Sequence, residues 1–326
     1  MIKIKINNSE FFVKKDISVL EACKYVGITV PRFCYHETLS VAGNCRMCLV
    51  EVADERTPKP VSSCTYPVSM EGMQIFTDTP LVKKARENVV ETLLLNHPLD
   101  CPICDQGGEC DLQDQTKTWG SDYSRFFFNK RGVEDKNCGP LIKTIMTRCI
   151  HCTRCVRFGT EIAGVDYMGT MNRGTSTEIG SYVSKMFNSE ISGNVIDLCP
   201  VGALTSKPYA FEARPWELKS NETVDLTDST GSSIYINFKE TEIMRILPKN
   251  NHEVNESIIT DKARFSYDAI KNQRLQKVFQ GVDENPSKFK DTDWAAVLNY
   301  LDDYLKKDSK KKVSFLINSE IDLESL

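Results

Sequence analysis

The chain has 326 residues, of which 40% are apolar and 26% charged, an ordinary composition for globular domains. Its length allows roughly two or three domains, each with its own core. The net charge of -4 gives no sign of the clustered basic surface that nucleic acid requires. No apolar run approaches the roughly 20 residues of a membrane-spanning helix. We therefore expect no nucleic-acid partner, and contact with a membrane only through partner subunits.

Cysteine is the unusual residue of this sequence. There are 13 cysteines, an odd number that cannot all be paired in disulfides, and the chain is too long for a disulfide-stapled miniprotein. All but Cys23 lie between Cys34 and Cys199, and none follows. This clustering indicates metal-binding thiols in a reducing compartment. The chain opens directly on an alternating segment, so we expect neither a signal peptide nor a presequence.

The first segment is predicted to form a small α+β domain. Ile2–Ile6 alternates apolar and polar side chains, Asn7-Asn8 is a turn signal, and Phe11–Val13 returns as the second strand of a hairpin. Ser18, with Glu21 three residues later, has the pattern of a capping box. A helix is therefore expected to begin at this point.

A second segment begins with the helix-start pair Thr79-Pro80, in which proline takes the first helical position. Pro98 is expected to stop this helix. Four apolar positions form its predicted buried face: Val82, Ala85, Val89 and Leu93.

Beyond about residue 220 the sequence predicts two strands, an amphipathic helix and a final buried strand. These are Ile234–Ile236, Ile243–Leu247, the helix carrying Trp294, Val297, Leu298 and Leu301, and the strand Val313–Ile317.

The first cysteine set has the spacing Cys-x10-Cys-x2-Cys-x15-Cys and consists of Cys34, Cys45, Cys48 and Cys64. Four thiolates complete the coordination of both irons of a [2Fe–2S] cluster. The permissive pair Gly43-Asn44 before Cys45 allows backbone N–H groups to turn toward the sulfurs. A four-cysteine zinc site is the alternative, although zinc ribbons usually pair two Cys-x2-Cys hooks and only one is present.

This first set carries a resemblance to a known family. The stretches Phe33-Cys34-Tyr35-His36-Glu37 and Leu39–Glu51 closely resemble the plant-ferredoxin-like domain of the large (75 kDa-type) iron–sulfur subunit of respiratory complex I, NADH:quinone oxidoreductase. The resemblance covers essentially the whole chain, and is weakest over residues 270–326.

The second set contains three cysteines and a histidine within fourteen residues: His97, Cys101, Cys104 and Cys110. From the residues alone, His97 could equally be a cation at the end of the preceding helix. The stretch from His97 to Cys110 is similar to the [4Fe–4S] motif of the same family, which implies one histidine and three cysteine ligands. Zinc bound by the same four side chains stays open as the alternative.

The third set consists of Cys149, Cys152 and Cys155, followed by the remote Cys199-Pro200. This spacing is typical of a bacterial-ferredoxin [4Fe–4S] cluster, with the distant cysteine as the fourth ligand. A zinc site is the weaker alternative. The neighbouring Arg148, Arg154 and Arg157 could raise the potential of a cluster or meet an acidic partner, and could equally be solvated surface residues.

The remaining candidates receive no ligand role. Cys23 is expected to be a small buried hydrophobic residue of the first helix, and Cys138 is assigned no role. His36 and His151, beside cluster cysteines, are expected to be near neighbours of the ligands or exposed. No dinucleotide fingerprint or P-loop is present, so we expect no NADH, flavin or quinone site and no catalytic residue in this chain.

The resemblance implies an α+β fold in four parts. These are a plant-type ferredoxin-like (β-grasp) [2Fe–2S] domain over residues 1–78, a small helical domain with the His-ligated [4Fe–4S] cluster over 79–137, a bacterial-ferredoxin-like domain over 138–218, and the truncated start of a molybdopterin-oxidoreductase-like α/β domain, without a molybdenum site, over 219–326.

The function implied is electron transfer within complex I, the proton-translocating NADH:ubiquinone oxidoreductase. Electrons would pass from the flavin subunit toward ubiquinone through one [2Fe–2S] and two [4Fe–4S] clusters. The alternative is a diaphorase or electron-transfer subunit of a NAD-linked hydrogenase or formate dehydrogenase. A zinc-stabilised interaction protein is a third candidate from a different class, and it would be colourless.

The expected partners are the flavin/NADH-binding subunit and other iron–sulfur subunits, and a separate chain that completes the C-terminal domain is a further hypothesis. The Asn/Lys/Ile/Ser-rich composition and the missing presequence favour a mitochondrially encoded protein on the matrix side of the inner membrane. The cytoplasmic face of a bacterial membrane is the alternative location.

Overall fold

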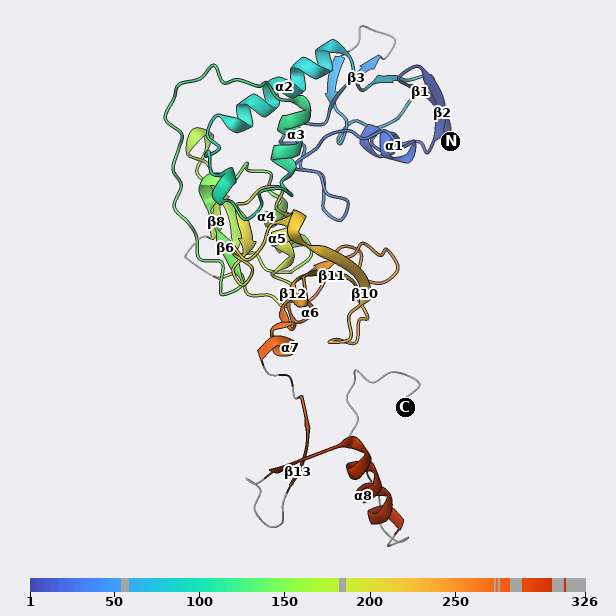
Figure 1. Cartoon of the computed structure of the whole chain (residues 1–326). Coiled ribbons are helices and arrows are strands. Elements are labelled where there is room, and N and C mark those ends of the chain that lie inside the picture. Colours follow the sequence, from blue (N-terminus) through green and yellow to red (C-terminus); the bar gives the residue numbers. More distant parts are fainter. Residues whose placement is uncertain are drawn as a thin grey trace. The chain divides into compact units, whose positions relative to one another are not determined.

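The computed structural model describes residues 1–53, 59–181, 186–272, 274, 276–281, 289–306 and 314. The chain divides into two compact units (Figure 1). One comprises Met1–Lys219 with Ile258–Asp261, and the other comprises Ser220–Ser257 with Lys262–Leu326. The predicted strand at 313–317 lies outside the described residues except for Ser314, which is in neither a helix nor a strand. The predicted boundaries at residues 78, 137 and 218 stay predictions.

The first unit begins with a five-stranded sheet in the order β2-β1-β5-β3-β4. Its strands are β1 (Ile2–Ile6), β2 (Ser9–Val13), β3 (Leu49–Ala53), β4 (Lys59–Ser62) and β5 (Gln74–Phe76). The hairpin of β1 and β2 is antiparallel, with Ile2 opposite Val13, whereas β1 and β5 are parallel. The predicted hairpin is confirmed.

The turn of this hairpin and the first helix follow from local chemistry. Asn7 and Asn8 have φ values of 47° and 72°, the left-handed conformation that a tight hairpin turn requires. The helix α1 (Val19–Tyr25) starts with the predicted capping box, in which Ser18 Oγ accepts from the Glu21 amide and the Glu21 carboxylate accepts from the Ser18 amide.

One apolar core lies between α1 and the sheet. Its fully buried members are Ile4, Ile6, Val19, Ala22, Cys23, Val50, Val68 and Ile75.

The helix α2 (Pro80–Leu94) begins as predicted, with Thr79 as N-cap, but its buried face is rotated. Val82, Arg86 and Val90 are buried, whereas the predicted Ala85, Val89 and Leu93 are only half-buried. The reason is a buried arginine. The Arg86 guanidinium donates two hydrogen bonds to the Leu49 carbonyl on β3, at 3.2 and 2.9 Å, and lies 4.6 Å from the Trp119 ring of α3 (Asp111–Trp119). The packing of α2 on β3 and α3 is visible in Figure 1.

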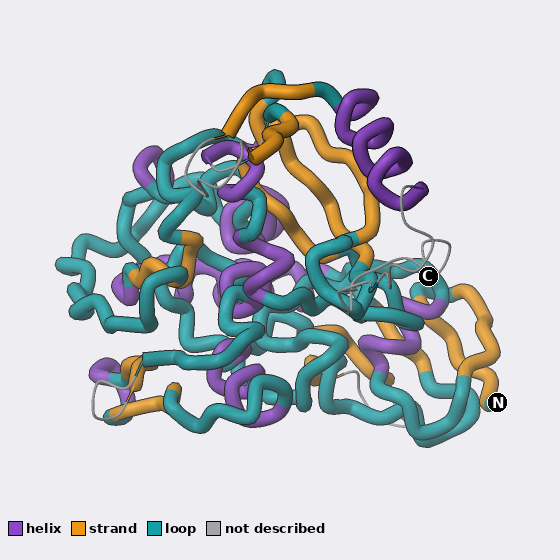
Figure 2. The backbone as a smooth tube through the Cα atoms, turned by 90° about the horizontal axis from the view of Figure 1, so that it is seen from below, coloured by secondary structure: helices purple, strands orange, loops and turns teal. Residues whose placement is uncertain are grey.

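The rest of the first unit is built from short elements joined by long loops, drawn in teal in Figure 2. Two-stranded sheets pair β6 (Ile142–Thr144) with β9 (Leu204–Ser206) and β7 (Met168–Met171) with β8 (Glu178–Ser181). The other elements are η1 (Cys101–Ile103), η2 (Met146–Arg148), α4 (Arg154–Glu161), η3 (Gly174–Ser176), α5 (Asn194–Leu198) and η5 (Pro215–Glu217).

The second unit carries the predicted strands. The sheet β10-β11-β12 contains β10 (Lys219–Val224), β11 (Ser233–Lys239) and β12 (Glu242–Pro248), so both strands predicted after residue 220 are confirmed. The other elements are α6 (Asp261–Phe265), α7 (Asp268–Asn272), β13 (Val278–Gly281), β14 (Phe289–Thr292) and α8 (Trp294–Lys306).

The predicted amphipathic helix is present as α8, and its apolar residues are exposed: 69% of Trp294 and 59% of Leu298 are accessible. Among the described residues, no helix has both the length and the apolarity to cross a bilayer.

Candidate metal centres

The first cysteine set is gathered at one end of the five-stranded sheet by two loops, one between α1 and β3 and one after β4. Cys34 follows α1, Cys45 and Cys48 precede β3, and Cys64 follows β4. The sulfurs of Cys48 and Cys64 are 3.4 Å apart, and the Cys34 amide donates to the Cys45 sulfur at 3.4 Å. The Cys64 thiol also interacts electrostatically with both Cys34 and Cys45. The structure therefore brings together all four predicted ligands.

Hydrogen bonding within this set favours thiolates at two positions. The Cys45 thiol lowers the pKa of Cys34 to about 5, and the Cys64 thiol lowers the pKa of Cys48 to about 6. The pKa values of Cys45 and Cys64 are raised, mainly by these same hydrogen bonds. Thiolates are the form of cysteine that binds iron, so the set is electronically suited to a metal group.

The loop before Cys45 turns as its residues suggest. Gly43 has a φ of 63°, and a Cβ added there would be 2.8 Å from the Thr65 side chain. The amides of Asn44 and Cys45 point at the Cys34 sulfur. Such N–H groups stabilise a negatively charged sulfur and the group it binds.

The second set surrounds a cavity. His97 follows α2, Cys101 and Cys104 belong to η1 and its end, and Cys110 is the N-cap of α3. All four line a cavity of 340 Å³, far above the roughly 10–15 Å³ that one water needs. Within the described residues, the buried Nδ1 of His97 has no hydrogen-bond partner. An unpartnered imidazole nitrogen beside three thiols in a cavity fits a bound metal group.

The environment of His97 does not suit a helix-terminal cation. Burial, together with Lys130 and Arg148, lowers its pKa to about 4. The imidazole is therefore neutral near pH 7, which is the form that binds metals.

The loop of the second set packs directly on the segment that follows Cys199. Cys110 Sγ lies 3.7 Å from the Pro200 carbonyl. A Cβ added at Gly202 would overlap the Cys104 sulfur and lie 3.2 Å from Gln106 Cβ. Only glycine allows this close approach of the backbone to the sulfur.

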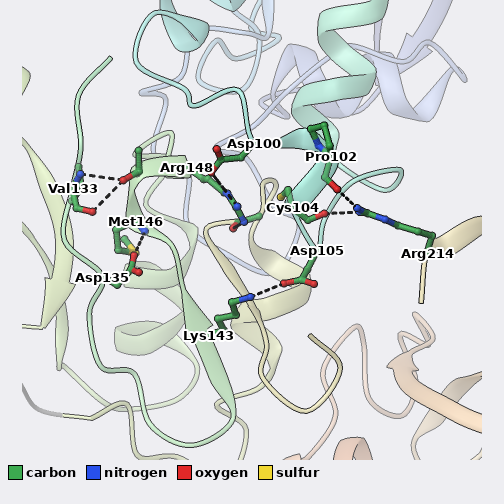
Figure 3. Close-up of polar contacts among 12 residues, drawn as sticks. Asp100, Pro102, Cys104, Asp105, Val133, Asp135, Lys143, Met146, Arg148 and Arg214 are labelled. Atoms are coloured by element: carbon green, nitrogen blue, oxygen red, sulfur yellow. Dashed lines mark hydrogen bonds and ion pairs between the residues drawn. The ribbon is translucent and has the colours of Figure 1, made fainter. Parts of the chain in front are cut away.

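Three cationic side chains from outside the second set fasten its loop (Figure 3). Arg148 donates to the Asp100 carboxylate at 3.1 Å, and Lys143 donates to the Asp105 carboxylate at 3.1 Å. Arg214 donates to two backbone carbonyls of the same loop, one of them at 2.6 Å. The loop is therefore tied to the segments around the third set.

The third set joins η2, α4 and the end of α5, with Cys152 and Cys155 buried and Cys149 and Cys199 half-buried. Cys149 ends η2, Cys152 lies in the loop, Cys155 is in α4, and Cys199 follows α5. The Cys155 thiol interacts electrostatically with each of the other three. Burial raises the pKa of Cys149, Cys152 and Cys199 to about 11, and that of Cys155 is also raised. Burial therefore keeps these side chains as neutral thiols, and a bound metal would offset the cost of burying them as thiolates.

Backbone conformation wraps this loop around its sulfurs. His151 and Thr153, between the cysteines, have positive φ values of 55° and 62°, which are rare for residues other than glycine. The amides of Val201, Ala203 and Leu204 point at the Cys199 sulfur. Strained backbone of this kind is typical of functional loops.

Two of the flanking arginines are buried, so the solvated interpretation is wrong for them. Arg148 is 3% exposed and Arg154 is 7% exposed. Both are held by backbone carbonyls, of Gly202 for Arg148 and of Leu198 and Tyr35 for Arg154.

The remaining cysteines and histidines lie in apolar clusters or beside the cysteine sets. All 13 cysteines are free thiols. Cys23 is fully buried in the first core, and burial raises its pKa to about 11. Cys138 is buried in a second apolar cluster. His36 contacts the Thr38 hydroxyl and His151 contacts Arg131, so both are half-buried neighbours of the ligands.

Within the described part of the chain, no three or more His, Cys, Asp or Glu side chains are gathered closely enough to hold a single metal ion. The four side chains of the second set instead line a cavity.

The sequence did not reveal two residues that shape these sites. Arg86 was not expected in a core, although its spacing of four from Val82 and Val90 placed it on their face. Gly202 follows Cys199-Pro200 closely enough that its position in the motif could have been noticed.

The α+β fold and the three gathered thiol sets place the chain in the class of iron–sulfur proteins. Four family models match successive segments and agree with this class. Residues 1–80 match a 2Fe-2S iron-sulfur cluster binding domain, and 86–125 match the NADH-ubiquinone oxidoreductase-G iron-sulfur binding region. Residues 139–205 match the ferredoxin-like domain of NADH-quinone oxidoreductase subunit 3, and 218–268 match the NDSU1/NuoG-like 4Fe-4S domain of NADH-ubiquinone oxidoreductase.

Curated relatives identify the particular family. The whole chain is 58% identical to the NADH-ubiquinone oxidoreductase 75 kDa subunit of Reclinomonas americana, covering 46% of that protein. It is 52% identical to the mitochondrial NADH dehydrogenase [ubiquinone] iron-sulfur protein 1 of Solanum tuberosum, covering 44%, and 52% identical to an NADH-quinone oxidoreductase subunit of Rickettsia felis, covering 48%. Over its whole length the chain is similar to these large complex I iron–sulfur subunits. It spans slightly less than half the length of these relatives.

A solved structure shares the fold. A chain from the crystal structure of an NAD+-reducing [NiFe]-hydrogenase in the H2-reduced state superposes with a TM-score of 0.59 at 23% identity, over 65% of this chain and 90% of that chain.

The name of the last family model does not fit this chain's residues. That model is named for a 4Fe-4S domain and matches residues 218–268, yet no cysteine follows Cys199. No thiolate set exists there, so the matched segment has no cysteine ligands for a cluster.

Proposed function

We propose that this chain is an electron-transfer subunit of NADH:ubiquinone oxidoreductase, complex I, and relays electrons from the flavin subunit toward ubiquinone. One observation carries the proposal. Thiols from all three ligand sets pack into a single apolar cluster, whose buried members are Phe33, Cys34, Met47, Val90, Cys110, Leu112, Ile150, Cys152, Val201 and Ala203. Electron tunnelling falls steeply with distance, so a relay requires sites that lie close together, and thiols packed into one cluster meet this requirement.

The proposed ligands are assigned set by set. Cys34, Cys45, Cys48 and Cys64 would hold a [2Fe–2S] cluster. His97, Cys101, Cys104 and Cys110 would hold one [4Fe–4S] cluster, and Cys149, Cys152, Cys155 and Cys199 a second. When bound, each cluster supplies reversible one-electron chemistry.

The chain's own residues would prepare these sites in two ways. Backbone amides aimed at Cys34 and Cys199 supply positive partial charge without ionisable groups. The buried Arg148 and Arg154 add full positive charge beside the second and third sets. Both features favour a more negative, reduced state at the sites.

The second candidate is a diaphorase or electron-transfer subunit of a NAD-linked hydrogenase or formate dehydrogenase. The fold shared with a chain of the hydrogenase structure favours it. The 52–58% identity to complex I subunits supports the first proposal more strongly. The proteins that copurify with the chain distinguish the two.

The proposed partners are the flavin/NADH-binding subunit and other iron–sulfur subunits, and these would bring the chain to the matrix face of the mitochondrial inner membrane. Relatives carry mitochondrial and bacterial names alike, so the cytoplasmic face of a bacterial membrane is the second proposed location. That a separate chain completes the C-terminal domain stays a prediction.

Low-temperature EPR of the dithionite-reduced native complex tests the proposal. We expect one [2Fe–2S] and two [4Fe–4S] signals assignable to this chain, and about 10 iron and 10 sulfide per chain after its isolation. Zinc in place of iron, or copurification with hydrogenase subunits alone, would overturn it.

A further inference from the structure

One side chain joins the ligand loops of the first and third sets. Arg157 lies on α4, and its Nη2 donates to the Cys34 carbonyl at 2.5 Å and to the Cys152 carbonyl at 3.3 Å. Its Nη1 donates to the Ser40 carbonyl, farther along the first loop. A single guanidinium therefore bridges two backbone segments far apart in the sequence, each carrying a proposed cluster ligand.

Two further side chains, Arg154 and Asn44, join the regions of the same two cysteine sets. Arg154 donates to the Tyr35 carbonyl at 3.0 Å and to the Leu198 carbonyl at 3.2 Å. Tyr35 follows the ligand Cys34, and Leu198 precedes the ligand Cys199. The Asn44 side-chain amide donates to the His151 carbonyl at 3.1 Å.

The Arg157 side chain is itself held in place. Its Nε donates to the Thr153 hydroxyl at 3.3 Å. The Ser40 amide and hydroxyl both donate to the Glu161 carboxylate, one turn along α4, with the amide at 2.9 Å. Since a guanidinium is planar with donors in fixed directions, it sets the separation of the carbonyls it bridges, which a lysine ammonium cannot do.

We propose that Arg157 is a positioning residue of the electron relay, which fixes the [2Fe–2S] ligand loop against the all-cysteine [4Fe–4S] ligand loop and holds a positive charge between them. The cluster part of this inference rests on the proposed function. The loop-clamping part rests only on the hydrogen bonds of Arg157. Substitutions of Arg157 that keep or remove its positive charge can therefore separate its effect on the potential from its effect on the two loops.

The test compares Arg157→Gln and Arg157→Lys in the assembled complex, with Arg125→Gln as the matched control. Arg125→Gln also removes one positive charge, and Arg125 pairs with Glu91 of α2 at 2.8 Å, on the exposed side of that helix. Amide hydrogen exchange measures the clamp, because the Cys34 and Ser40 amides are themselves hydrogen-bonded. EPR redox titration measures how the positive charge of Arg157 changes the midpoint potential of the [2Fe–2S] centre.

Both Arg157 variants should raise exchange over residues 33–41 at least about tenfold, because losing even one of the three charge-assisted hydrogen bonds has an effect of that size. Exchange in the hairpin of β1 and β2 should not change. The midpoint potential of the [2Fe–2S] centre should fall in Arg157→Gln and much less in Arg157→Lys. Arg125→Gln should change neither readout.

Unchanged exchange over residues 33–41, or an equal rise throughout the chain, would overturn the inference that Arg157 holds the two loops together. Equal potentials in Arg157→Gln and the unsubstituted protein would overturn the charge role. If the unsubstituted complex lacked the iron–sulfur signals, the proposed function would fail, and the exchange data would still decide the clamp.

Discussion

Alanine at Gly202 would place a methyl group inside the space of the Cys104 sulfur. Non-bonded atoms pack best at roughly 3.5–4.0 Å, so the sulfur or the backbone must move by more than about 1 Å. The two backbones cannot easily separate, because the Cys104 carbonyl is held by Arg214 at 2.6 Å and the Gly202 carbonyl accepts from Arg148. The sulfur must therefore turn away from the position that it takes beside the cavity. Overpacking of this kind costs about 1–3 kcal/mol.

The assay for Gly202→Ala is EPR of the reduced complex, together with iron analysis of the chain. We expect loss of the signal from the second set, while the [2Fe–2S] signal persists. Gly169→Ala is the control, since a Cβ at Gly169 meets no atom within 4 Å and its φ is not positive. An unchanged second-set signal in Gly202→Ala would refute the argument that glycine is required beside Cys104.

Three other substitutions test separate parts of the structure. His97→Ala should remove about four irons per chain and the signal of one [4Fe–4S] centre, measured by iron analysis and EPR; full iron content would exclude His97 as a ligand. Arg86→Met should lower the free energy of unfolding by about 2 kcal/mol, because the Leu49 carbonyl, on a half-buried residue, loses two charged donors; urea unfolding followed by circular dichroism measures this, and an unchanged free energy would contradict a stabilising role of the buried guanidinium. Ser18→Ala should cost about 1 kcal/mol through loss of the capping box, measured in the same way, whereas Ser9→Ala on the exposed end of β2 should cost much less.

Local patterns in the sequence predicted the local structure well. The capping box at Ser18, the N-cap at Thr79 and the hairpin at Asn7-Asn8 each depend on neighbouring residues only, and each is present. The ligand sets were visible for the same reason, since the cysteines within each motif lie close in sequence. Even the remote Cys64 and Cys199 are gathered with their predicted sets.

The features that sequence reasoning missed all depend on tertiary packing. Arg86 is buried because the Leu49 carbonyl and the Trp119 ring meet it from other elements. Gly202 matters because a distant loop places Cys104 against it. The bridge made by Arg157 joins loops far apart along the chain. No local periodicity carries information about such contacts, so polar residues beside the cysteines could not be divided into buried and solvated ones.

The most direct measurement is anomalous X-ray scattering from crystals of the native complex, recorded at the iron and zinc absorption edges. We expect iron density within each of the three ligand sets, next to Cys48, Cys104 and Cys155, and no zinc density there. Zinc at these positions, or iron absent from any one set, would contradict the assignment of this chain as a carrier of three iron–sulfur clusters.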